Sequence, residues 1–160
     1  MSRSGYSDDW DGEWWDHIRW RGQVASAIRG KRGQAFLQEL VVALDAMPER
    51  RLIKNNLEHA GNVCAIGSVG VKRGLDMTAL DPEDFVTIAG RFGVAPQLVQ
   101  EIEWENDEGD YTETPEQRWT RMRAWAVSLI AKTTPIASPG NHASNRGSVE
   151  GDHNRREPGV

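Results

Sequence analysis

The sequence has one cysteine, four histidines and no long run of apolar residues, and each shortage excludes a class of protein. The single cysteine, Cys64, cannot form an intrachain disulfide, which favours a reducing compartment. No apolar run approaches the roughly 18–20 residues that cross a bilayer. The acidic N-terminus also lacks the apolar segment of a secretory signal. We therefore expect a cytoplasmic protein that does not contact a membrane.

Metal and cofactor chemistry are also disfavoured by what is missing. The histidines are scattered (His17, His59, His142 and His153), and one cysteine cannot build a structural zinc site. We expect no metal, no cofactor and no catalytic residue. The alternative is an enzyme with Cys64 as nucleophile, for which His59 is the base nearest in sequence. A small thiol among apolar neighbours is more typical of a core residue.

Positive charge is in short supply as well. The 160-residue chain carries a net charge of −5, with 38% hydrophobic and 27% charged residues. This composition predicts one globular domain. The negative balance opposes long-range attraction to nucleic acid or to an anionic membrane, although a local basic patch can still bind.

The chain divides into three parts by composition. Residues 1–12 form an acidic, tryptophan-containing arm and residues 133–160 a tail almost without large apolar side chains, so both are expected to be disordered. Residues 13–132 predict a mainly α domain. We expect a compact bundle of about four to six helices, with a helix-turn-helix-like pair and at most one small hairpin.

Three helices follow from apolar spacing and end signals. Apolar residues recur at helical intervals in residues 14–30, 34–47 and in the segment that begins at Pro115. The last of these opens with a capping box, in which Thr114 caps the helix and Gln117 reaches back.

Residues 49–75 allow two interpretations. The first part could be a short helix ended by Gly61, or a hairpin that turns at "HAGN". The second part, "VCAIGSVGVKRG", reads as a small-residue helix or as a strand that runs into one. We favour helix throughout, provided that another helix packs closely on Gly67 and Gly70.

The stretch "FVTIAGRFGVAPQLVQEI", residues 85–102, has the spacing of a helix-turn-helix. Asp81 is the expected N-cap, Gly93 the expected turn residue with positive φ, and Pro96 the start of the second helix. The geometry is favoured, but geometry alone does not establish DNA binding.

Charge argues against a DNA-reading role for this pair. The positions expected to be exposed on the second helix are Gln97, Gln100, Glu101, Glu103 and Glu105. Eight acids and no Lys or Arg lie between residues 101 and 116, an acidic ridge that would repel a polyanion. Gln97 and Gln100, with Arg91, are therefore the candidate nucleic-acid contacts of an alternative function only.

A basic and aromatic region precedes this pair. No acid occurs in residues 17–32, whose cations have tryptophans beside them. Such a region suits a protein-binding hot spot, a stacking surface for single-stranded nucleic acid, or simply a solvated helix face. The candidate partner-binding residues are Trp10, Trp15, Arg19, Arg21, Arg29, Lys31 and Arg32.

The order "NVCAIGSVG", "EIEWENDE" and "TPEQRWTRMRAW" is similar to small uncharacterised bacterial and bacteriophage proteins with a "VCAxGA" segment and a later "ND". The resemblance covers about residues 49–130. This chain departs from the pattern at Ser68, where Ala is commoner, and in its tryptophan-rich N-terminal helix. The shared positions are Cys64, Ala65, Gly67, Asn106 and Asp107. The resemblance implies a compact helical domain in a phage or prophage setting, and no reaction.

Taken alone, the Asn106–Asp107 pair is expected to cap a helix end and shape the turn after it. The leading functional hypothesis is a non-enzymatic binding or regulatory protein that contacts another protein. The basic region and the acidic ridge together would also permit head-to-tail homodimers. A helix-turn-helix-type nucleic-acid-binding regulator is the alternative.

Overall fold

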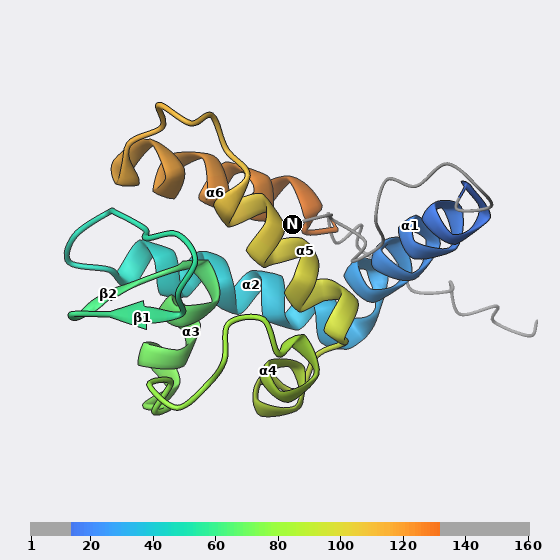
Figure 1. Cartoon of the computed structure of the whole chain (residues 1–160), viewed down its shortest axis with the longest axis horizontal. Coiled ribbons are helices and arrows are strands. Elements are labelled where there is room, and N and C mark those ends of the chain that lie inside the picture. Colours follow the sequence, from blue (N-terminus) through green and yellow to red (C-terminus); the bar gives the residue numbers. More distant parts are fainter. Residues whose placement is uncertain (1–13, 132–160) are drawn as a thin grey trace, which may run out of the picture.

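The computed structural model describes residues 14–131, which contain six helices and one small antiparallel sheet (Figure 1). The predicted mainly α fold class is confirmed. The predicted arm at 1–12 and tail at 133–160 lie outside the described residues. The elements are α1 (Trp14–Arg29), α2 (Lys31–Ala46), β1 (Glu58–His59), β2 (Asn62–Val63), α3 (Ala65–Arg73), α4 (Phe85–Phe92), α5 (Pro96–Asp107) and α6 (Pro115–Leu129).

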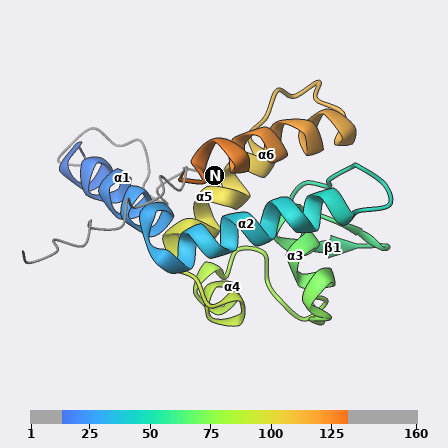
Figure 2. The same ribbon diagram turned by 180° about the vertical axis from the view of Figure 1, so that it is seen from behind.

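Helix α5 occupies the centre of this arrangement. It contacts α1, α3, α4 and α6, while α2 packs against α3 and α6. Helix α1 extends from one end of the domain, and the view from behind shows the same projection (Figure 2). Helix α5 is thus surrounded by other helices, and α1 projects from the rest of the domain.

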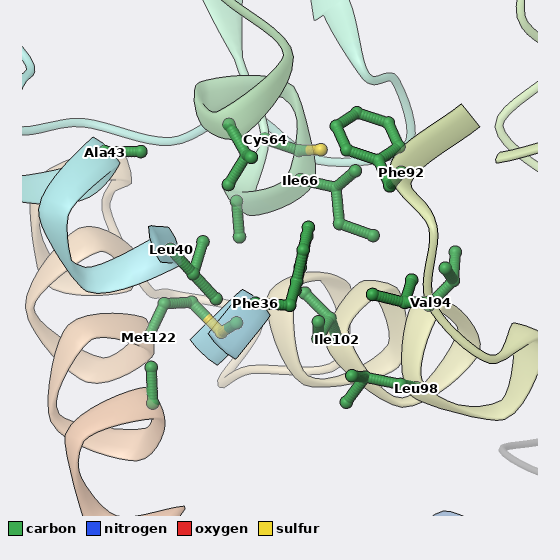
Figure 3. Packing of buried hydrophobic residues seen from close by; sticks show 14 of the residues in the cluster. Phe36, Leu40, Ala43, Cys64, Ile66, Phe92, Val94, Leu98, Ile102 and Met122 are labelled. Carbon is green, nitrogen blue, oxygen red and sulfur yellow. The ribbon is translucent and has the colours of Figure 1, made fainter. Parts of the chain in front are cut away.

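One apolar core joins the helices. Phe36 and Leu40 of α2 and Met122 of α6 meet side chains of α5 there, as Figure 3 shows. Leu40, Ile102 and Met122 have no exposed surface at all. Burial of one such side chain contributes roughly 1.5–3 kcal/mol. These contacts tie the first half of the chain to the second.

The predicted capping box of α6 is present. The Thr114 hydroxyl accepts from the Gln117 backbone N–H at 3.2 Å, and the Thr114 N–H donates to the Gln117 side chain at 2.8 Å. Helix α2 begins earlier than expected, with only Gly30 between it and α1. Gly33 permits this tight corner, because a Cβ there would collide with the carbonyl oxygen of Ala27.

The helix favoured for residues 49–63 is wrong, and the alternative hairpin is correct. Ala60 and Gly61 both have positive φ, 49° and 77°, as the central residues of a tight hairpin turn require. The paired strands are held to the preceding loop by a bond from the Ile53 N–H to the Val63 carbonyl, 3.0 Å. Residues 65–73 do form the expected helix.

The close approach expected on α3 comes from the hairpin region and from the loop after α3 rather than from another helix. A Cβ at Gly67 would collide with the backbone carbonyl of Leu57, and one at Gly70 with the side chain of Met77. The small residues of α3 are therefore explained by backbone and loop contacts.

Helices α4 and α5 form the predicted pair with one change. Gly93 has φ 73° and ends α4, and Pro96 opens α5, both as expected. The N-cap of α4 is Asp84, whose side chain accepts from the Thr87 N–H at 3.0 Å, so the assignment to Asp81 is wrong. Asp81 instead accepts from the Glu83 N–H in the preceding turn.

Candidate functional site

Helix α1 has one face on the domain and one in solvent. Trp20 and Val24 are buried on the inner face, with 8% and 7% exposure. Trp15 and Ile18 lie on the outer face and are 66% and 41% exposed. Arg19 is exposed on the same face. A largely exposed tryptophan beside arginine is the composition typical of protein-binding hot spots.

The predicted cations at the α1–α2 corner, and Arg21 about two turns earlier on α1, are all at the surface. Arg21, Arg29, Lys31 and Arg32 are exposed, and none of them makes an ion pair with another described residue. By contrast, Arg73 pairs with Glu39 at 2.6 Å, and Arg123 pairs with Asp45 at the same distance. The corner therefore carries positive charge that the described part of the chain leaves uncompensated.

A groove of about 480 Å³ opens at this corner. We call it the corner groove. Among its lining residues are Gln23 and Ser26 of α1, Lys31 and Arg32 of α2, and Ala95 and Gln97 at the start of α5. The Gln97 amide donates to the Gln23 side chain at 3.3 Å. The groove thus brings two predicted partner-binding residues together with a residue predicted for the nucleic-acid alternative.

Helix α5 lacks the open face that a DNA-recognition helix needs. Every residue from Pro96 to Asp107 is buried or half-buried. Gln97 and Gln100 are half-buried, and Arg91 is exposed on α4. A recognition helix must place a row of side chains in the major groove. The α4–α5 pair instead places its second helix in the middle of the domain.

The predicted exposed acids of α5 require a correction. Glu101 and Glu103 are buried, with 5% and 6% exposure, and Glu105 is half-buried. Because other helices pack on several sides of α5, these positions lie in the interior and the expected polar face does not form. Farther along, Glu113 binds Arg121 at 2.6 Å. The acidic ridge is therefore interrupted by burial and by arginine.

A hydrogen-bond network joins the loop before the hairpin to α3 and α5. The Asn106 side chain accepts from the Ala65 N–H at 3.1 Å and donates to the Ile53 carbonyl at 2.9 Å. Asp107 accepts from the Asn55 N–H at 3.2 Å. Asn106 and Asp107 therefore make long-range contacts, and the expectation that they cap the end of α5 is wrong. The C-cap is Glu108.

Cys64 belongs to the same network. Its thiol donates to Glu103 at 3.2 Å and accepts from the Gly67 N–H at 3.3 Å, which caps α3. The bonds of Cys64 adjoin those of Asn106 and Asp107 through the peptide bond from Cys64 to Ala65, so all five positions of the resemblance pattern lie in one connected network. We call it the Cys64–Asn106 network. These hydrogen bonds hold the first half of the domain to the second, which is a structural role.

The environment of Cys64 does not suit a nucleophile. Desolvation and the nearby Glu103 raise the pKa of the Cys64 thiol well above its usual value. The thiol is fully buried, while His59 is exposed on the hairpin. A reactive cysteine needs a lowered pKa and access to substrate. The core assignment made from the sequence is confirmed.

Glu103 is the residue that sequence reasoning missed. Burial raises its pKa to about 8, and the charge of Asp107 adds to the shift. A signal was present, because Val99, Glu103 and Asn106 recur at helical spacing on the buried side of α5. Because glutamate side chains are usually exposed, Glu103 was predicted to belong to the acidic ridge.

Trp10 lies outside the described residues. Within residues 14–131, no group of three His, Cys, Asp or Glu residues is arranged to hold a metal ion. No helix in that range is both long and apolar enough to cross a membrane. The fold and the surface thus define a mainly α domain with a basic corner and an exposed tryptophan on the outer face of α1.

Comparisons of the chain with protein-family models, curated protein sequences and solved structures found no match.

Proposed function

We propose that this chain is a non-enzymatic binding protein that acts by contact with another protein through α1 and the α1–α2 corner. The observation that carries the proposal is the outer face of α1, where Trp15 is 66% exposed beside the exposed Arg19. Trp and Arg are the residues most enriched at the energetic centres of protein interfaces. A phage or prophage accessory role in the cytoplasm fits the resemblance pattern and the single cysteine.

The partner surface should be acidic. The exposed cations Arg21, Arg29 and Lys31 are without ion pairs to other described residues, so a partner can supply the opposite charge. Complementary charge speeds association and fixes the orientation of partners. A second copy of this chain is a poorer candidate, because Glu101 and Glu103 are buried and Glu113 is bound to Arg121.

Nucleic acid is the weaker alternative for the same surface. The enclosed α5 argues against major-groove insertion, and the net charge of −5 opposes long-range attraction to phosphates. Arg91 remains exposed on α4, but the acidic residues Asp81, Glu83 and Asp84 precede that helix.

The proposal predicts that the protein does not bind nucleic acid. Labelled mixed-sequence DNA and RNA would be titrated with the full chain, with fluorescence anisotropy as the readout, at roughly 50 and 200 mM salt. We expect no binding at micromolar protein at either salt. Micromolar binding that weakens steeply with salt would contradict the proposal. A further loss in a Gln97→Ala/Gln100→Ala variant would then assign that binding to α5.

A further inference from the structure

The corner groove lies where two helices begin. Both α2 and α5 start without a side-chain cap, at Gly30 and Ala95, and neither has an acid in its first turn. The first backbone N–H groups of a helix have no partner within it, and the helix dipole places positive potential there. The open end of α2 adds to the charges of Lys31 and Arg32, whereas α5 adds less, because Pro96 has no N–H and the Leu98 N–H donates to the Ala95 carbonyl at 3.0 Å.

No acidic side chain among the described residues that line this groove neutralises that potential, and the opposing charge there is the partial negative charge of the last carbonyl groups of α1. Of the described residues that line it, none is acidic and none is aromatic. The second groove, about 660 Å³ between the end of α2, the hairpin and α3, is different. Its cations are Arg51 and Lys72, but it also contains Glu49, which pairs with Arg51 at 3.3 Å. We call it the hairpin groove. It offers a matched comparison with one lysine and one arginine.

We propose that the corner groove binds the carboxylate side chains of an acidic segment of the protein partner. This rests on the proposed function and adds to it the chemistry of the bound segment. Carboxylates fit the groove because Arg32 can bind one with two parallel hydrogen bonds, and the open N–H groups of α2 can donate to another. The occupant is therefore an acidic peptide stretch.

The groove suits a peptide better than a nucleic acid strand. Single-stranded nucleic acid is held by aromatic side chains on which successive bases stack, and the groove lining contains no ring. The exposed tryptophan of α1, Trp15, lies at the opposite end of that helix from the groove. At 1.5 Å per residue the helix separates the two by about 20 Å, which about six extended residues cover. A peptide with acids at one end and an apolar residue at the other matches this spacing.

The test is binding of a labelled oligoglutamate peptide of about eight residues, long enough to cover the groove and part of α1. Anisotropy would be measured with the full chain, with Lys31→Glu/Arg32→Glu, and with Arg51→Glu/Lys72→Glu as the matched control. Both double variants change the net charge equally. Glutamate in the first turn of α2 favours the helix dipole, so the corner variant should fold as well as the wild type.

We expect the corner variant to bind the peptide at least about tenfold more weakly, because two cations become repulsive, and the hairpin-groove variant to bind within about twofold of wild type. An equal loss in both double variants would overturn the inference, because binding would then follow net charge alone. Absence of binding to the wild type would also overturn it. So would displacement of the peptide by inorganic phosphate at the concentration at which free glutamate peptide displaces it, because the groove would then be a phosphate site.

A third variant separates this inference from the proposed function. If Trp15→Ala/Arg19→Ala abolishes peptide binding while Lys31→Glu/Arg32→Glu does not, α1 binds the acidic segment and the corner groove does not. If the groove binds the peptide but the α1 substitutions leave every natural partner bound, the groove inference stands and the proposed function fails.

Discussion

Glu103→Gln will remove most of the fall in stability that the wild-type protein shows between roughly pH 5 and 8. In the folded protein burial raises the pKa of Glu103 to about 8, against a usual value of 4.5. The folded state therefore keeps a proton that the unfolded chain releases over this range. A raised folded pKa stabilises the protein below the unfolded value, and that contribution is lost as the pH rises. The expected slope is about 1.4 kcal/mol of unfolding free energy per pH unit.

Glutamine mimics the neutral acid and does not titrate, so this site should no longer make the unfolding free energy of the variant depend on pH. It can still accept the bond from the Cys64 thiol, which lies 3.2 Å from the carboxyl oxygen. Urea unfolding at several pH values measures the effect. The control is Glu101→Gln, a second buried glutamate on the same helix, which leaves Glu103 and hence the slope in place. A wild-type slope in Glu103→Gln would show that Glu103 is ionised in the folded state at neutral pH.

Gly67→Ala should be the most damaging single-methyl change in α3. The new Cβ would collide with the Leu57 carbonyl, which already accepts from the Cys64 N–H at 3.1 Å. The hairpin or the helix must then move, and the bonds of Cys64 and Ala65 within the Cys64–Asn106 network depend on both. We expect a loss of about 3 kcal/mol or more, a large share of the roughly 5–15 kcal/mol that stabilises a domain.

The matched control is Gly90→Ala on α4. A Cβ at Gly90 meets nothing within 4 Å, and the residue is exposed in a helix. That change should stabilise the protein by roughly 0.5–1 kcal/mol through helix propensity. Thermal or urea unfolding of the two variants gives the comparison. Similar small effects from both would mean that the hairpin does not pack on α3 as described.

The parts of the fold that sequence predicted are those set by local signals. Apolar spacing located α1 and α2, and the Thr114–Gln117 capping box located α6. The hairpin remained the less favoured of two alternatives because each strand has two residues, too few for an alternating pattern. Its position depends on bonds such as that from the Ile53 N–H to the Val63 carbonyl, which local preference does not encode.

The candidate site was predictable by composition and not by arrangement. The basic and aromatic character of residues 14–32 was visible in the sequence, and the exposure of Trp15 agrees with it. That Gln97 would lie in the same groove as Lys31 and Arg32 depends on the packing of α1 against α5. Glu103 was wrongly predicted to be exposed, because a charged side chain is usually at the surface. Its position on the helix places it in the core.

The most direct test of the proposed function compares protein capture by the wild-type chain and by Trp15→Ala/Arg19→Ala. Extract of the source cells would be treated with nuclease, and bound proteins would be quantified by mass spectrometry. The control, Val86→Ala/Arg91→Ala, removes one exposed apolar side chain and one exposed arginine from α4. Surface changes of this kind should leave the thermal midpoint within about 3 °C.

We predict that at least one protein is captured by both the wild type and the control. Its capture by Trp15→Ala/Arg19→Ala should be at least about tenfold lower, because truncation of a hot-spot tryptophan and arginine weakens binding by that much. Equal capture by all three chains would contradict a protein contact through α1. Unfolding of Trp15→Ala/Arg19→Ala would contradict it too, because the two side chains would then be part of the core.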